Sequence, residues 1–78
     1  MNKAHKVLIK MKQAPKNNWS PKDIKTLCLA YGLRLRQKGT SHGVLTNKKG
    51  EHLTIPMHKP IKPIYIKKLI KLIEDDEI

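Results

Sequence analysis

The period of the apolar residues changes at Gly32 in this 78-residue chain, and this change constrains the fold more than any other feature. Before Gly32, apolar side chains recur every three or four residues, as they do on one face of a helix. Directly after it, Leu33-Arg34-Leu35-Arg36 alternates between apolar and basic side chains, as a strand with one buried side does. A chain this short that contains both periods is expected to form one small α+β domain.

Three helices are expected. The first covers residues 2–14. The second begins at the N-cap pattern Ser20-Pro21-Lys22-Asp23 and ends at Gly32. The third begins near Ile64, after two prolines. The apolar faces consist of Ala4, Val7, Leu8, Met11 and Ala14 in the first helix, Ile24, Leu27, Cys28 and Tyr31 in the second, and Ile66, Leu69, Ile70 and Ile73 in the third.

Three antiparallel strands are expected between the second and third helices, over residues 33–36, 42–47 and 51–55, with a turn at 47–50. If Asn47 pairs with Glu51, the hairpin register follows and sorts the side chains into two faces. The apolar face, which the helices should cover, consists of Leu33, Leu35, Gly43, Leu45, Leu53 and Ile55. The opposite face consists of Arg34, Arg36, His42, Val44, Thr46, His52 and Thr54.

The charge of the chain is strongly positive and unevenly distributed. There are 17 Lys and Arg residues against six Asp and Glu, which gives a net charge of +11. Four of the acids lie in residues 74–78, so residues 1–73 carry 17 basic and two acidic side chains, or +15. Such a surface suits a polyanion or an acidic protein partner. The simpler interpretation is that a lysine-rich surface only keeps a small protein in solution.

Several classes of protein are disfavoured by the same composition. No apolar run approaches the roughly 18 residues of a membrane span, and the three Lys in the first ten residues do not suit a signal peptide. One cysteine, Cys28, permits no internal disulfide and no cysteine-based zinc site. His42, His52 and His58 lack the spacing of zinc ligands. We therefore expect a cytoplasmic protein that has no membrane segment and uses neither metal nor cofactor.

The Ser41-His42 pair, at the start of the second strand, is the strongest candidate for chemistry. A histidine can take or give a proton near neutral pH, as RNA cleavage by the ribose 2′-hydroxyl requires. Arg34, Arg36 or Lys38 would then stabilise the charge that develops on the phosphate. The plainer interpretation is that His42 is a polar residue on an exposed strand.

Two other histidines are weaker candidates. His52 is expected across the hairpin from Thr46, and His58 precedes the third helix. Either is a candidate second acid–base group or a phosphate contact, although a solvated histidine is the simpler interpretation of both. Trp19 is better explained as a hydrophobic staple than as a platform for stacked bases.

At these residues the chain resembles the HicA toxins, over Ser20 to Ile73. The resemblance lies in Gly39-Thr40-Ser41-His42, in Thr54-Ile55-Pro56-Met57-His58 and in the lysine-rich helix that follows. It implies a double-stranded-RNA-binding-domain-like α-β-β-β-α fold, with helices on one face of the sheet. Residues 19–73 would be the HicA-like core, 1–18 an additional helical segment and 74–78 an acidic tail.

The resemblance also implies a function, that of an mRNA interferase in a type II toxin–antitoxin system. His42 would then be the histidine of RNA cleavage, and a HicB-type antitoxin protein would inhibit the enzyme. The residues expected to bind RNA are Arg34, Arg36, Lys38, Ser41, His52 and His58. Two alternatives stay open at this point: a non-catalytic basic RNA-binding module, and a protein-interaction domain for an acidic partner.

Overall fold

The computed structural model describes residues 3–37 and 41–76 and confirms the expected α+β fold. Its elements follow the expected order of two helices, three strands and a helix. They are α1 (Lys3–Gln13), α2 (Pro21–Tyr31), β1 (Arg34–Gln37), β2 (His42–Thr46), β3 (His52–Pro56) and α3 (Pro63–Asp76). Each boundary lies within a few residues of the position predicted from the sequence.

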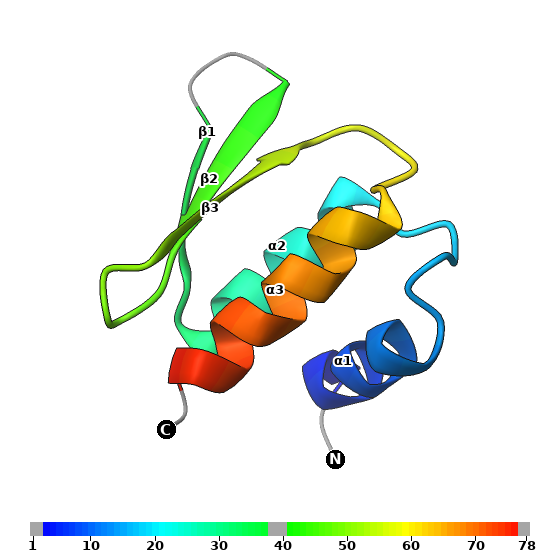
Figure 1. Ribbon diagram of the computed structural model, residues 1–78, viewed down its shortest axis with the longest axis horizontal. Helices are drawn as coiled ribbons and strands as arrows, with labels where there is room; N and C mark the ends of the chain where they lie inside the picture. The colour runs from blue at the N-terminus through cyan, green and yellow to red at the C-terminus, as the bar shows by residue number, and fades with distance from the viewer. Residues whose placement is uncertain (1–2, 38–40, 77–78) are drawn as a thin grey trace.

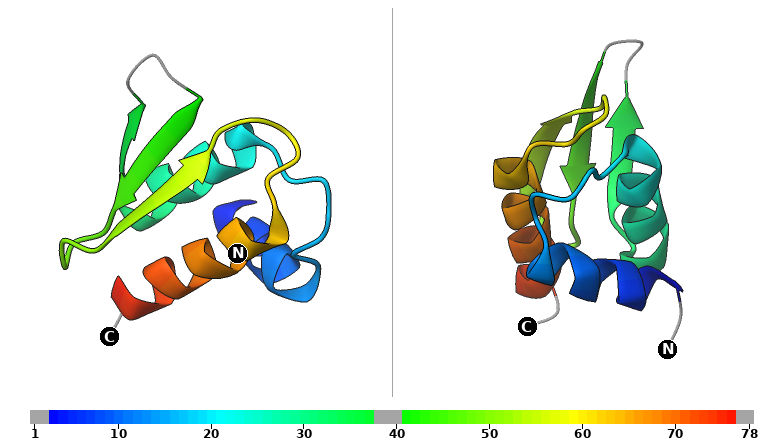
Figure 2. Two further views of the ribbon diagram at one scale, coloured as in Figure 1. Left: turned by 45° about the horizontal axis from the view of Figure 1, so that its top comes forward. Right: turned by 90° about the vertical axis from the view of Figure 1, so that its right-hand side faces the viewer.

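The elements form three layers (Figure 1). The strands make an antiparallel sheet in the order β1-β2-β3, and α2 and α3 lie side by side on one of its faces. Helix α1 makes its main contacts with α2 and α3, and it crosses their outer side, away from the sheet (Figure 2). The additional N-terminal helix therefore covers the helical layer and leaves the other face of the sheet uncovered.

Both ends of α2 have the structure that their sequence predicts. The carboxylate of Asp23 accepts hydrogen bonds from the backbone N–H of Ser20 at 3.0 Å and from its hydroxyl at 3.1 Å. Gly32 has φ +69°, the left-handed conformation that favours glycine. The carbonyl of Cys28 accepts hydrogen bonds from the N–H groups of both Gly32 and Leu33. The chain is thus turned directly from α2 into β1.

The hairpin register is the one expected from pairing Asn47 with Glu51. Leu45 is opposite Leu53, and Gly43 is opposite Ile55. On the other side of β2, Leu35 is opposite Leu45. Because side chains alternate along a strand, the apolar residues share the face against the helices. Leu45 and Ile55 are completely buried there.

Trp19 joins the N-terminal segment to the rest of the fold. Its indole N–H donates a hydrogen bond to the carbonyl of Ala14 at 2.9 Å, and its own carbonyl accepts one from Ile61 at 2.9 Å. The ring is buried in the same apolar core that takes Leu8 and Met11 from α1. Only 6% of its surface is exposed, too little for a base to stack on, which agrees with the staple interpretation.

Helix α3 continues beyond Ile73 into the segment that the sequence suggested is an acidic tail. It extends to Asp76, and the carboxylate of Glu74 lies 2.6 Å from Nζ of Lys12. Glu74 therefore belongs to the contact between α3 and α1 rather than to a separate tail.

Candidate functional site

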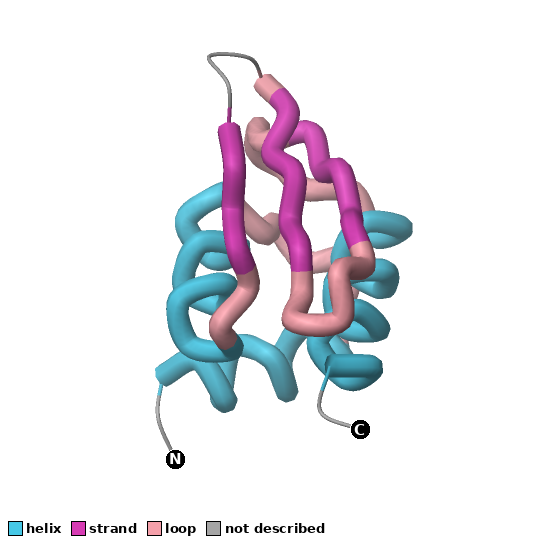
Figure 3. The backbone as a smooth tube through the Cα atoms, turned by 90° about the vertical axis from the view of Figure 1, so that its left-hand side faces the viewer, coloured by secondary structure: helices cyan, strands magenta, loops and turns pink. Residues whose placement is uncertain are grey.

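The face of the sheet that no helix covers is turned toward the viewer in Figure 3. The strand register places its polar residues in rows that run across the strands. One row contains Arg34, Thr46 and His52. The next contains Arg36, Val44 and Thr54, and the last pairs His42 with Pro56. Both arginines and both histidines are exposed. The structure thus brings four of the predicted site residues to one surface.

The backbone on both sides of His42 is held by short contacts. Before it, the carbonyl of Ser41 accepts a hydrogen bond from the N–H of Met57. After it, Gly43 is buried so closely that an added Cβ would lie 2.9 Å from Cγ of Met57 and 3.1 Å from Cδ1 of Leu35. His42 therefore projects into solvent from a strand whose position is fixed by packing underneath.

His52 is held by its neighbour in the row. Its Nδ1 lies 3.0 Å from the hydroxyl oxygen of Thr46, within hydrogen-bond distance. This contact orients the imidazole ring and leaves Nε2 as the nitrogen available to a ligand. The prediction that His52 lies across the hairpin from Thr46 is confirmed.

The two histidines of the sheet are too far apart to act on one phosphodiester. His42 is opposite Pro56, whereas His52 is opposite Thr46, four residues further along β2. At the rise of an antiparallel strand, four residues correspond to roughly 13 Å. The two side chains therefore contact different parts of any ligand that lies along β2.

His58 lies at the same end of the sheet as His42. It follows Met57, whose N–H is bonded to Ser41, and it is exposed. With Pro56, Pro60, Lys62 and Tyr65 it lines a small hollow of about 70 Å³. Of the two weaker histidine candidates, the chain brings His58 and not His52 close to the start of β2.

Ser41 and Cys28 differ in their surroundings. Ser41 is exposed directly before β2, and Lys38 lies outside the residues that the structure describes. Cys28 is buried in the core, and this burial raises the pKa of its thiol from 9.0 to about 11. A neutral, enclosed thiol is a poor nucleophile, so Cys28 is a core residue.

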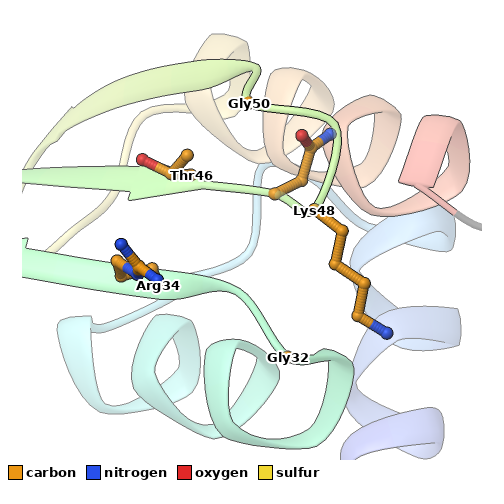
Figure 4. Close-up of a pocket in the computed structure, with 6 residues that line it drawn as sticks. Gly32, Arg34, Thr46, Lys48 and Gly50 are labelled. Atoms are coloured by element: carbon orange, nitrogen blue, oxygen red, sulfur yellow. The ribbon is translucent and has the colours of Figure 1, made fainter.

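Lys48 is a site residue that the sequence did not reveal. Together with Arg34 and Thr46 it lines a hollow of about 310 Å³ at the turn end of the sheet (Figure 4). The sequence places Lys48 and Lys49 side by side in one turn, and nothing in that pattern distinguishes their directions. The fold separates them, because Lys49 does not line the hollow.

No family model, no curated protein and no solved structure was found to match this chain. Among residues 3–37 and 41–76, no group of three or more His, Cys, Asp or Glu side chains is placed to hold a metal ion. None of the helices in the described part of the chain is long and apolar enough to cross a membrane.

Proposed function

We propose that this chain is a HicA-like mRNA interferase, a metal-independent endoribonuclease that uses His42 in acid–base catalysis. The observation that carries the proposal is the position of His42, exposed on a firmly packed strand with Arg36 in the neighbouring row. A proton-transfer group on a rigid strand, beside cations that attract phosphate, is what RNA cleavage without metal requires.

The reaction would begin with attack of a ribose 2′-hydroxyl on the adjacent phosphorus. The bond between the 2′-oxygen and phosphorus forms as the bond to the 5′-oxygen of the next nucleotide breaks. One group accepts the 2′-hydroxyl proton and another protonates the leaving oxygen. The products are a 2′,3′-cyclic phosphate and a 5′-hydroxyl. Arginine at position 36 would stabilise the additional negative charge on the phosphate oxygens during transfer.

We assign the second proton-transfer role to His58. The register offset of four residues keeps His52 away from a phosphate at His42. The hydrogen bond from the N–H of Met57 to the carbonyl of Ser41 instead brings the segment that follows β3 close to His42. His52, Arg34 and Ser41 would instead contact the RNA backbone on either side of the cleaved bond.

The charge supports a polyanionic substrate and an acidic inhibitor. Residues 1–73 carry a net charge of +15, and RNA or an acidic HicB-type antitoxin would neutralise it. A toxin that cleaves mRNA acts in the cytoplasm, which is the compartment we propose.

The deciding experiment is RNA cleavage by purified wild-type and His42→Ala proteins in the presence of a chelator. We expect the wild-type protein to leave 2′,3′-cyclic phosphate ends. The variant should lose roughly 10²- to 10⁴-fold in rate while it keeps its melting temperature and its RNA affinity. Persistent cleavage by the variant would remove His42 from the mechanism.

A non-catalytic RNA-binding module is the second candidate, since Arg34 and Arg36 project from the same exposed face. In that case wild-type protein would bind RNA without cutting it. The double variant Arg34→Ala, Arg36→Ala should weaken RNA binding and reduce its salt dependence under either function. Each phosphate contact on a single strand contributes about 0.7 to the slope of log K against log salt concentration, so losing contacts makes the slope shallower.

A further inference from the structure

The hollow at the turn end of the sheet is lined by Gly32, Arg34, Thr46, Asn47, Lys48 and Gly50. We propose that it is a phosphate-binding subsite, which holds the RNA backbone at a nucleotide other than the one cleaved at His42. This inference rests on the proposed function for the identity of the ligand, and on the geometry of the hollow for its chemistry.

The polar groups around the hollow are suited to an anion. Arg34 and Thr46 project from neighbouring strands, and Lys48 extends from the turn toward Gly32 (Figure 4). A guanidinium and an ammonium are the two side-chain groups that bind phosphate best. The hydroxyl of Thr46, which lies 3.0 Å from Nδ1 of His52, adds a polar group to the same hollow. Among the residues that the structure describes, no carboxylate lines the hollow, although Glu51 directly follows Gly50 in the chain.

Lys48 is positioned by the end of α2. Its Cε lies 3.4 Å, and its Nζ 3.9 Å, from the point that a Cβ on Gly32 would occupy. The lysine side chain therefore lies across a glycine and is not fully extended into solvent.

The turn that carries Lys48 is itself well ordered. The side-chain oxygen of Asn47 accepts hydrogen bonds from the N–H groups of Lys49 at 3.0 Å and Glu51 at 2.9 Å. The N–H of Gly50 donates a further bond to the carbonyl of Asn47 at 3.0 Å. One wall of the hollow is thus a closed turn rather than a free loop.

The hollow also has the size and place of a backbone subsite. Its volume of about 310 Å³ is roughly ten times that of a water molecule in the liquid, which leaves room for a phosphate and part of its ribose. Thr46 is four residues from His42 along β2, or roughly 13 Å. An RNA strand held here would extend along β2 toward His42.

Lys48 also lies near the C-terminal end of α2, where a cation interacts favourably with the helix dipole. A purely structural role of this kind makes a different prediction. Removing the charge would then lower stability and leave phosphate binding unchanged.

The test compares Lys48→Gln with Lys49→Gln, which removes the same charge one residue away and outside the hollow. The first probe is a single-stranded RNA with 2′-O-methyl groups at every position, which cannot be cleaved, so its binding is independent of catalysis. We expect Lys48→Gln to weaken binding several-fold and to reduce the salt slope by about 0.7. Lys49→Gln should have a clearly smaller effect on both.

The second probe is inorganic phosphate, followed through the backbone amide resonances of wild-type protein. We expect shifts at Thr46, Lys48 and Gly50 that disappear in Lys48→Gln and persist in Lys49→Gln. Equal effects of the two variants on RNA would overturn the subsite, as would a Lys48→Gln protein that only melts earlier. Should phosphate shift these amides while wild-type protein binds no RNA, the subsite would stand and the proposed function would fail.

Discussion

The side-chain amide of Asn47 donates a hydrogen bond to the carbonyl oxygen of Leu72, 3.3 Å away, and so ties the β2–β3 turn to α3. The same Nδ2 lies 3.0 Å from a carboxylate oxygen of Glu51. Asn47 is the buried polar residue of the described core, with 5% of its surface exposed. One side chain therefore organises the turn and joins it to α3, at a residue 25 positions further along the chain.

Replacing Asn47 should destabilise the protein more than its place in a surface turn suggests. Asn47→Ala leaves the N–H groups of Lys49 and Glu51 and the Leu72 carbonyl without this partner, which should cost about 2–3 kcal/mol in urea unfolding. Asn47→Asp should also be destabilising, because a carboxylate would face the carboxylate of Glu51. Lys49→Ala is the control in the same turn. If it destabilises as much as Asn47→Ala, the side-chain bonds are not the cause.

A methyl group at Gly43 should disturb both the packing and the proposed chemistry. Its Cβ would approach Met57 and Leu35 too closely, so Gly43→Ala should cost about 1–3 kcal/mol and slow RNA cleavage by displacing His42. In a double-mutant cycle with Met57→Ala, the double variant should lose less stability than the sum of the losses in the two single variants, because the shorter side chain at position 57 makes room for the added methyl group.

Gly50→Ala provides the contrast for that cycle. A Cβ added at Gly50 would have no described atom within 4 Å. Gly50→Ala should therefore lower the free energy of unfolding by about 1–2 kcal/mol, and only because of the positive φ of +83°. Strict additivity of Gly43→Ala and Met57→Ala would contradict the proposed clash.

Neighbouring residues of α1 should differ sharply in their contribution to stability. Met11 is completely buried, so Met11→Ala should cost about 2–4 kcal/mol. Lys12 pairs with Glu74, but both side chains are about half exposed, at 44% and 50%. Lys12→Ala should therefore change the free energy of unfolding by less than about 1 kcal/mol. Similar losses in the two variants would mean that the ion pair, and not apolar packing, attaches α1.

The buried thiol of Cys28 should make stability fall at alkaline pH. Its pKa is about 11 in the folded protein against 9.0 for an ordinary thiol, so the unfolded chain loses the proton first. The stabilisation that the neutral, buried thiol contributes to the folded protein is fully present below pH 9, and it is lost as the pH rises toward 11. The stability difference between wild type and Cys28→Ala should narrow over this window by at most about 1.4 kcal/mol per pH unit. A stability difference between wild type and Cys28→Ala that stays constant from pH 8 to 11 would contradict this prediction.

The histidines at the two ends of the sheet should give separable kinetic effects. His58→Ala should lower kcat by roughly 10²-fold or more, because it would transfer a proton. His52→Ala should mainly raise KM, since its ring lies beside Thr46 and far from His42. A larger loss of kcat in His52→Ala than in His58→Ala would reverse the assignment.

Much of the fold follows from local sequence. The Ser20 and Asp23 pattern begins α2 where expected, and Gly32 ends it, because both depend on hydrogen bonds within a few residues. The pairing of Asn47 with Glu51 determines which side chains of β2 and β3 share a face, since alternation along a strand has no other freedom. The exposed surface that contains Arg34, Arg36 and both sheet histidines was therefore predictable.

What local sequence could not decide is which distant residues meet. The bond from Asn47 to Leu72, the path of Lys48 across Gly32 and the nearness of His58 to the start of β2 all join segments that belong to different elements. Such contacts depend on how α2 and α3 pack against the sheet, which is set by the shape of the whole core rather than by any local period. The sequence by itself determined the elements, the register and the polar face; only the tertiary structure decided which of its histidines and lysines lie together.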